Sequence, residues 1–223
     1  MERLGEELRS NERNRNTDEG QSGRPPMHEV FVEDGLVRKP WSVERDAYRD
    51  HLLRLDAKSR HNRVAGAIAD DMFRIYAATA HDSNVNIYGF VMDGVLRGAA
   101  DLRILGREAE AAFSIEKPWQ SHGVGSALLE RCRLAARNRG VKLVQVCCLM
   151  ENHRMQQLAR KFEAELTFDF GTVIGKMENS HPTPLSVMQE MAVDGHSFAA
   201  SCIDFQSRLF QARGGSRSAP TAS

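Results

Sequence analysis

The spacing of apolar residues switches between a period of two and a period of about 3.6 along the chain, which predicts alternating strands and helices. Apolar alternation predicts strands over His28–Val32, Leu36–Arg38, Val85–Met92, Val95–Ile104, Ala109–Ile115, Val141–Leu149, Leu166–Phe170 and Thr172–Met177. Helical spacing predicts helices from Ser42 onward and over Ser59–Tyr76, Val124–Asn138, Asn152–Ala164 and Ser197–Ala212. We therefore expect a mixed α/β sheet with helices on both sides, followed by a C-terminal helical extension.

The two ends of the chain differ in composition from the middle. Residues 1–26 are rich in Arg, Glu, Asn, Gly and Ser, and residues 214–223 are also poor in large apolar side chains. Such segments cannot bury enough apolar surface to offset the entropy lost on ordering, so we expect two disordered tails. Between them we expect a folded domain over 27–178 and an extension over 179–213 that contains the last helix.

The overall composition narrows the function classes. The chain has 223 residues, of which 41% are hydrophobic, and its 30 Lys and Arg balance its 30 Asp and Glu. Proteins that bind nucleic acid or anionic membranes by bulk charge are usually basic, whereas this net charge is zero. No apolar run is long enough to cross a membrane, and the charged N-terminus lacks the apolar core of a signal peptide. We therefore expect a cytoplasmic protein with neither nucleic acid nor membrane as a partner.

The residue types that bind metal or form cross-links show no functional pattern. The four cysteines indicate reduced thiols, because a chain of this length does not depend on disulfides. The histidines lack the spacing of zinc ligands, so we expect no metal. The basic stretch Arg54–Arg63 lacks the aromatic residues that stack on bases, so a solvent-facing helix surface explains it better than a nucleic-acid contact.

The most informative stretch is Phe113–Ala127, which predicts a strand end, a short glycine-containing loop and the start of a long helix. A helix N-terminus attracts anions, because its first turn leaves about four N–H groups without helical partners. Gly123 and Gly125 would let this backbone approach a phosphate closely. The loop lacks both the ending of a Walker loop and the third glycine of a dinucleotide fingerprint. A glycine-rich turn with no ligand explains the loop equally well on its own.

The run Gln120-Ser121-His122-Gly123-Val124-Gly125 and the order of the predicted elements resemble the GNAT superfamily of acyl-CoA-dependent N-acetyltransferases, over about residues 30–178. The resemblance implies a mostly antiparallel sheet, with acetyl-CoA as co-substrate and its diphosphate on this loop. It also implies that the preceding strand holds the pantetheine arm and that an asparagine faces the CoA. The implied binding residues are Phe113, Ser114, Ile115, Gln120, Ser121, His122, Gly123, Val124, Gly125, Ser126 and Asn152.

Three segments are similar, more narrowly, to the GNAT domains of bacterial Pat-type protein lysine acetyltransferases: Leu53–Arg63, Ala109–Ile115 and Asn152–Arg160. By this similarity Glu110 matches the general base, which takes a proton from the attacking amine. Glu108 is the second candidate. In an unbroken strand Glu110 would lie opposite Phe113 and Ile115, so a solvent-facing carboxylate is the alternative interpretation.

The chain departs from the family at positions that matter for catalysis. The tyrosine that often protonates the leaving thiolate corresponds to Ala159, and the usual Gly-Phe after that helix is replaced by Glu163-Ala164. Ser121-His122 stand where the family often has a glycine and a basic residue; His122 could pair with a phosphate or face solvent. These departures leave the proton donor for the thiolate unassigned.

We therefore expect an N-acetyltransferase in which a primary amine attacks the acetyl-CoA thioester directly. A non-catalytic acyl-CoA-binding or sensor domain and a scaffold protein with the same fold are the alternatives. The acceptor stays open between a small molecule and a protein lysine. The C-terminal helix could cover its own domain or that of a second copy, so the sequence also allows a homodimer.

Overall fold

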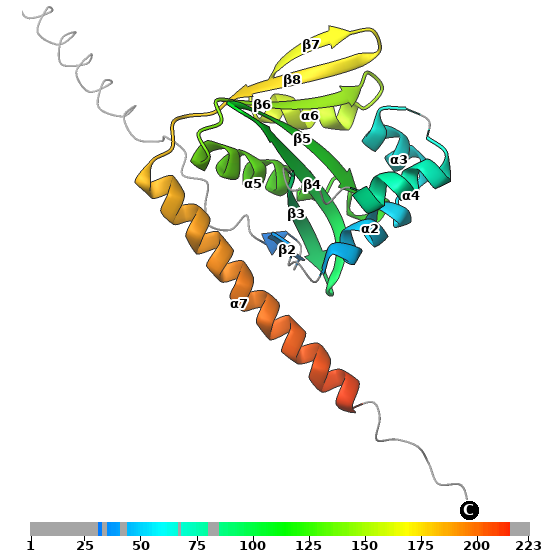
Figure 1. The fold of residues 1–223 in the computed structure, drawn as a ribbon, viewed down its shortest axis with the longest axis vertical. Helices are drawn as coiled ribbons and strands as arrows, with labels where there is room; N and C mark the ends of the chain where they lie inside the picture. The colour runs from blue at the N-terminus through cyan, green and yellow to red at the C-terminus, as the bar shows by residue number, and fades with distance from the viewer. Residues whose placement is uncertain (1–30, 33–34, 41–43, 67, 80–84, 215–223) are drawn as a thin grey trace, which may run out of the picture.

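The computed structural model describes residues 31–32, 35–40, 44–66, 68–79 and 85–214. Within these ranges one sheet of eight strands runs in the order β1-β2-β3-β4-β5-β6-β8-β7 (Figure 1). The strands are β1 (Phe31–Val32), β2 (Gly35–Arg38), β3 (Val85–Met92), β4 (Val95–Leu105), β5 (Glu108–Ile115), β6 (Leu143–Leu149), β7 (Glu165–Asp169) and β8 (Thr172–Glu178). Only the β5–β6 pair of this described sheet is parallel, which confirms the mixed, mostly antiparallel fold.

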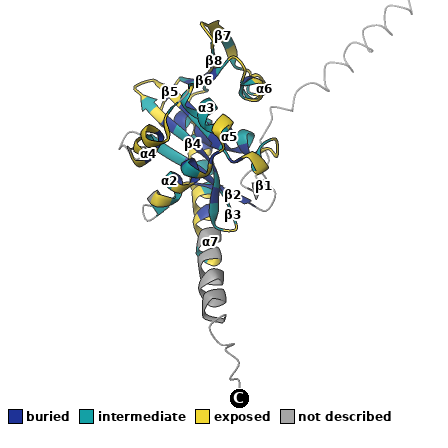
Figure 2. Ribbon diagram, turned by 90° about the vertical axis from the view of Figure 1, so that its right-hand side faces the viewer, coloured by how far each residue is buried: buried dark blue, intermediate teal, exposed yellow. Residues whose placement is uncertain are grey.

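Helices cover both faces of the sheet. The helices are α2 (Arg45–Arg54), α3 (Ala57–Val64), α4 (Asp70–Thr79), the short η3 (Lys117–Trp119), α5 (Val124–Asn138), α6 (His153–Lys161) and α7 (Pro184–Gly214). One core cluster joins α5 and α6 to one sheet face, and a second joins α2 and α4 to the other. Buried residues gather in the middle of the sheet, whereas β7 is mostly exposed (Figure 2).

The register between β4 and β5 decides which side chains share a face. The pairing runs without a shift from Gly98↔Ile115 to Leu105↔Glu108. Side chains therefore alternate regularly along β5. Phe113 and Ile115 pack on the face covered by α5, and Ser114 and Glu110 lie on the opposite face, toward α2.

The two parallel strands separate soon after they begin. Their pairs extend from Glu108↔Leu143 to Glu110↔Gln145, and among the described residues the later halves of β5 and β6 are not paired with each other. The two strands spread apart at this point in the sheet (Figure 1). The opening leaves the end of β5 accessible from the side of β6.

The prediction of one helix over Ser59–Tyr76 is wrong, because the structure contains two helices there. The first, α3, ends at Val64, and its C-cap Ala65 has a φ of +52° in the left-handed region. The second, α4, begins at Asp70 and has two acidic residues in its first turn. Apolar residues on both helices pack against the same cluster, so their spacing imitates one continuous helix.

The C-terminal helix is confirmed, but it begins earlier than the prediction of Ser197. It starts at Pro184, and its buried side is polar, with Ser186 and Ser197 packed inward. Because the buried residues there are polar, apolar periodicity could not detect the part of the helix before Ser197. The predicted start at Ser42, the strand residues 28–30 and the predicted tail over 1–26 lie outside the described residues. Of the predicted tail over 214–223, Gly214 ends α7 and residues 215–223 lie outside the described residues.

Candidate active site

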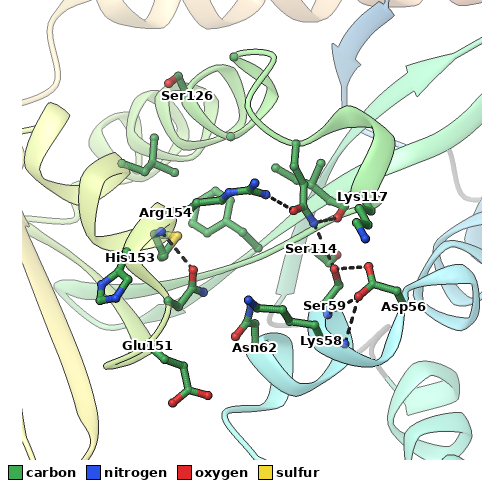
Figure 3. Close-up of a pocket in the computed structure, with 18 residues that line it drawn as sticks. Asp56, Lys58, Ser59, Asn62, Ser114, Lys117, Ser126, Glu151, His153 and Arg154 are labelled. Atoms are coloured by element: carbon green, nitrogen blue, oxygen red, sulfur yellow. Dashed lines mark hydrogen bonds between the residues drawn. The ribbon is translucent and has the colours of Figure 1, made fainter.

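A cleft of about 630 Å³ opens where β5 separates from β6. Four segments line it: α3 and the residue before it, the end of β5 with the following loop, the start of α5, and the start of α6 (Figure 3). The lining residues are Asp56, Lys58, Ser59, Asn62, Phe113, Ser114, Ile115, Lys117, Gln120, Gly123, Gly125, Ser126, Glu151, Asn152, His153, Arg154, Met155 and Leu158.

The N-terminus of α5 forms one end of this cleft. Gly123 is the N-cap with a φ of +87°, a conformation that side-chain-bearing residues rarely adopt. A Cβ on Gly125 would lie 3.3 Å from Leu158 and 3.5 Å from Ile115, so a larger residue would narrow the cleft. The first turn of α5 contains no acidic residue. This end of a 15-residue helix therefore presents a partial positive charge to the cleft.

Gln120 ties the loop to three other elements. Its side-chain Nε2 donates to the Ile115 carbonyl at 2.8 Å and to the Ser59 hydroxyl at 3.1 Å. Its Oε1 accepts a hydrogen bond from Arg154 of α6. The amide thus fixes β5, α3 and α6 relative to each other across the cleft (Figure 3).

Asp56 organises the wall formed by α3. Its carboxylate caps the helix by accepting hydrogen bonds from the backbone N–H groups of Lys58 and Ser59 at 3.1 Å. The Ser59 hydroxyl donates to the same carboxylate at 2.7 Å and accepts from Gln120. Burial raises the pKa of Asp56, but the bonds from Ser59 and Lys58 outweigh it, so the pKa is lowered.

Beneath the cleft, three buried polar side chains form a chain of contacts from Ser114 inward. The Ser114 Oγ lies 3.0 Å from Nε2 of His51 on α2, and His51 Nδ1 lies 3.3 Å from the Glu116 carboxylate. Glu116 also accepts hydrogen bonds from Arg54 at 2.9 Å and from Arg97 at 3.1 Å. Burial raises the pKa of Glu116, but hydrogen bonds from His51, Arg97 and Arg54 outweigh it, so the pKa is lowered and Glu116 is held as a carboxylate.

Most of the sequence-predicted binding residues meet at the cleft. Those that line it are Phe113, Ser114, Ile115, Gln120, Gly123, Gly125, Ser126 and Asn152. Ser121 and His122 are exposed and do not line it, and Val124 is 1% exposed and belongs to the core. Asn152 caps α6, because its Oδ1 accepts from the Met155 N–H at 3.2 Å.

The predicted general base does not line the cleft. Glu110 is exposed on the face of β5 that also holds Ser114. Burial raises the pKa of the nearby Cys147 thiol, and the charge of Glu110 raises it further. Glu108, the second candidate, accepts a hydrogen bond from Gln145 at 2.8 Å. Both carboxylates are on the half of β5 that is paired with β6.

Several lining residues were not predicted from the sequence as site residues. Lys58, Lys117 and Arg154 bring cationic groups to the cleft. The capping residue Asp56 was detectable as the start of a helix, but no sequence spacing placed that helix on the cleft. With the α5 N-terminus, these cations fit an extended anionic ligand.

Other chemistries find little support in the described part of the chain. It contains no group of three or more His, Cys, Asp or Glu side chains placed to hold a metal ion. None of the helices in the described ranges is both long and apolar enough to span a membrane. Cys132 and Cys148 are buried free thiols, and burial raises the pKa of Cys148 to about 11. This thiol is therefore a poor nucleophile at neutral pH.

Solved structures with the same fold come from several acetyltransferases. The GNAT domain of S. lividans PAT is 19% identical with a TM-score of 0.57, and the match covers 70% of this chain and 99% of that one. The ribosomal-protein-S18-alanine N-acetyltransferase of Escherichia coli is 14% identical with a TM-score of 0.52, over 67% and 97% of the two chains. The PaiA N-acetyltransferase of Thermoplasma acidophilum, solved with coenzyme A, is 13% identical with a TM-score of 0.53, over 65% and 98%.

Sequence comparison agrees with the fold. No curated protein matches this sequence. A sequence model of the acetyltransferase (GNAT) family, however, matches residues 44–163, which include α2, β5, the glycine loop, α5 and α6. This range is more than half of the 223 residues and contains every residue that lines the cleft. The chain belongs to the GNAT family of acetyltransferases.

Proposed function

We propose that this protein is an N-acetyltransferase that transfers the acetyl group of acetyl-CoA to a primary amine. The main observation in support is that the residues predicted as a diphosphate loop line one cleft together with the end of β5. These residues are Gln120, Gly123 and Gly125. The coenzyme A complex of the structurally similar PaiA enzyme supports acetyl-CoA as the co-substrate.

We place the diphosphate at the N-terminus of α5, where helix amides and the partial positive charge favour an anion. Lys58, Lys117 and Arg154 would contribute further positive charge. The pantetheine arm would lie along the end of β5, whose backbone is not paired with β6 within the described residues. An extended arm can hydrogen-bond to such an edge as an added strand does.

The reaction we propose is direct attack of the amine on the thioester carbonyl. Holding both reactants in one cleft supplies much of the acceleration, since the encounter becomes effectively intramolecular. A backbone N–H near the end of β5 would stabilise the developing oxyanion. Glu110 is the carboxylate proposed from the sequence as general base. Its exposed position on β5 requires the acceptor to reach it, or a water to bridge the two.

The acceptor we propose is a cationic amine. Asp56 and Glu151 line the cleft and would attract an ammonium group. The S18-alanine enzyme is named for a protein substrate, whereas PaiA is not. A protein lysine is therefore our second acceptor class, after a small amine. We expect the reaction to occur in the cytoplasm.

A non-catalytic acyl-CoA sensor is the competing function, and one observation favours it. Ala159 is buried on α6 at the position where the family often has its tyrosine acid, so no hydroxyl reaches the cleft from there. A sensor would bind acetyl-CoA and release no CoA.

The decisive test is an acetyl-transfer assay in the presence of small primary amines, polyamines and lysine peptides. We expect acetylated product by mass spectrometry together with stoichiometric release of CoA thiol. Glu110→Gln should reduce kcat by at least about tenfold if Glu110 is the base, because general-base catalysis is worth about 100-fold or more. Binding of acetyl-CoA without release of CoA for any acceptor would favour the sensor.

A further inference from the structure

Ser114 is the only residue of the contact chain Ser114–His51–Glu116 that lines the cleft, and it is 5% exposed. Behind it His51 is fully buried, at 0% exposure, and Glu116 is 7% exposed. Burying a polar triplet costs free energy unless each member is satisfied, and here each has a partner. An apolar side chain at position 51 would pack against the sheet equally well. The hydrogen bond between the buried imidazole and a hydroxyl that lines the cleft therefore indicates a chemical role.

The partners of His51 assign its tautomer. Glu116 is held as a carboxylate by Arg54 and Arg97, so it can only accept a hydrogen bond. His51 Nδ1 therefore carries a proton that it donates to Glu116 at 3.3 Å. The Nε2 atom is then the basic nitrogen, and the Ser114 hydroxyl donates to it at 3.0 Å. This order of hydroxyl, imidazole and carboxylate is the one that activates serine in acyl-transfer enzymes of unrelated fold.

We propose that Ser114 and His51 form a proton relay for acetyl transfer, with Ser114 as the group that contacts the reacting atoms and with His51 and Glu116 as positioning residues. The inference rests on the proposed acetyltransferase function. It assigns the proton transfers of the reaction to residues that the sequence did not identify for that role. They lie at the end of β5 that lines the cleft, whereas Glu110 is in the half of β5 that pairs with β6.

The relay conserves atoms and protons through the reaction. The ammonium form of the acceptor first loses one proton to bulk water. The neutral amine nitrogen then attacks the carbonyl carbon, so that a C–N bond forms and the C–S bond breaks. The nitrogen loses its proton to the Ser114 oxygen while the Ser114 proton passes to His51 Nε2. The departing CoA thiolate then takes a proton from the Ser114 hydroxyl, which regains one from His51. Amine and acetyl-CoA become amide and CoA thiol, and the relay returns to its first state.

Two features of the site favour this route. Ala159 provides no acid from α6, so a side-chain donor for the thiolate has to come from another element. Glu110 shares a face of β5 with Ser114 but is four residues away, about 13 Å along a strand, and does not line the cleft. Ser114 lies between Phe113 and Ile115, the residues predicted to hold the pantetheine arm that ends in the thioester.

The test compares full-length wild-type protein with Ser114→Ala, Ser114→Thr and His51→Gln. The readouts are release of CoA thiol from saturating acetyl-CoA, with a lysine peptide or spermidine as acceptor and with water alone, and the Kd for acetyl-CoA by calorimetry. Ser114→Ala should lower kcat at least about 100-fold while the Kd changes less than about threefold. Ser114→Thr, which keeps a hydroxyl, should recover much of that rate. His51→Gln should resemble Ser114→Ala.

Each failure has a distinct signature. A folded Ser114→Ala protein that keeps the wild-type kcat would overturn the relay and leave the acetyltransferase function in place. A large loss in Glu110→Gln combined with none in Ser114→Ala would assign proton transfer to Glu110 instead. Equal losses in Ser114→Ala and Ser114→Thr would show that side-chain volume matters rather than the hydroxyl. Wild-type protein that releases no CoA to any acceptor or to water would overturn the proposed function and the relay together.

Discussion

Arg63 on α3 is a buried charge whose partners come from three other elements, α2, α4 and β4. Its guanidinium forms an ion pair with Asp101 of β4, and its side chain is 3% exposed. The Tyr48 hydroxyl donates to the same carboxylate at 2.7 Å. Burial lowers the pKa of Arg63, but the Asp101 charge raises it more, so the pKa is raised overall. These contacts fix α3, which forms a wall of the cleft, to the sheet.

Replacing Asp101 by Asn should therefore destabilise the fold strongly. The change leaves the Arg63 charge buried without its counter-ion, which costs about 3–5 kcal/mol in comparable pairs. Tyr48→Phe removes the hydroxyl that donates to Asp101 and accepts from Arg63 but removes no charge, and should cost only about 1–3 kcal/mol. Urea unfolding followed by circular dichroism measures both. Similar losses in the two variants would contradict the dominant role of the ion pair.

The lowered pKa of Glu116 should make the free energy of unfolding depend on pH. Its folded pKa is lowered, since bonds from His51, Arg97 and Arg54 outweigh burial, so the unfolded state binds its proton more readily. This contribution is fully present above the unfolded value of 4.5 and is lost as the pH falls through the folded pKa. Glu116→Gln should therefore lose less stability than wild type between neutral pH and pH 3. The measurement is the urea concentration at the unfolding midpoint as a function of pH. An equal decrease of this midpoint below neutral pH in wild type and Glu116→Gln would contradict the role assigned to Glu116.

At the scale of elements, the N-cap of α3 links helix stability to the shape of the cleft. Asp56→Ala removes both backbone caps and should cost about 1 kcal/mol. It also removes the acceptor of the Ser59 hydroxyl, which contacts Gln120. We expect acetyl-CoA affinity to fall severalfold, measured by calorimetry. Asp56→Asn keeps a capping oxygen and is the matched control; an equal affinity loss there would mean that charge, not capping, matters.

The helices differ in how far the sequence could predict them. Both ends of the α5 prediction, Val124 and Asn138, are confirmed, because one apolar face packs on one core and glycines flank it. The break after α3 was missed, since Ala65 is not a residue type that signals a left-handed turn. The first half of α7 was missed because polar groups, not apolar ones, form its buried side. Periodicity detects burial only where burial is apolar.

At the scale of the molecule, ion pairs and hydrogen bonds hold α7 against the C-terminal part of α5. Glu190 accepts hydrogen bonds from Asn138 at 2.7 Å and from Arg139 at 3.0 Å. Arg131 of α5, which is buried, pairs with Asp194 one turn further along α7. Figure 1 shows the later part of α7 extending past the sheet.

Glu190→Ala should loosen this docking and cost about 3 kcal/mol, because Arg131 and Arg139 lose a largely buried counter-charge. Met188→Ala is the control on the same helix, since Met188 is 66% exposed, and should stay within about 0.5 kcal/mol of wild type. Urea unfolding would compare them, and equal stabilities would contradict the charge-fastened docking. The homodimer stays a prediction that sedimentation equilibrium can test.

The sequence predicted only part of the set of residues that line the cleft. The loop residues Gln120, Gly123 and Gly125 were identified because glycine spacing before a helix has direct physical meaning. Tertiary structure alone brings Lys58 of α3 and Arg154 of α6 to the same space, since neither is near the loop in sequence. The His51 contact with Ser114 spans 63 residues and left no local pattern.

The central claim is that the loop before α5 binds the diphosphate of acetyl-CoA, and calorimetric titration tests it most directly. Wild type and Gly140→Glu should bind with micromolar Kd, whereas Gly123→Glu should not bind. Both variants place a carboxylate on a glycine of positive φ, which is +87° at Gly123 before α5 and +74° at Gly140 after it. The two variants therefore match in backbone strain and differ in which end of α5 carries the charge. Absence of binding by folded wild type, or equal binding by Gly123→Glu, would contradict the account.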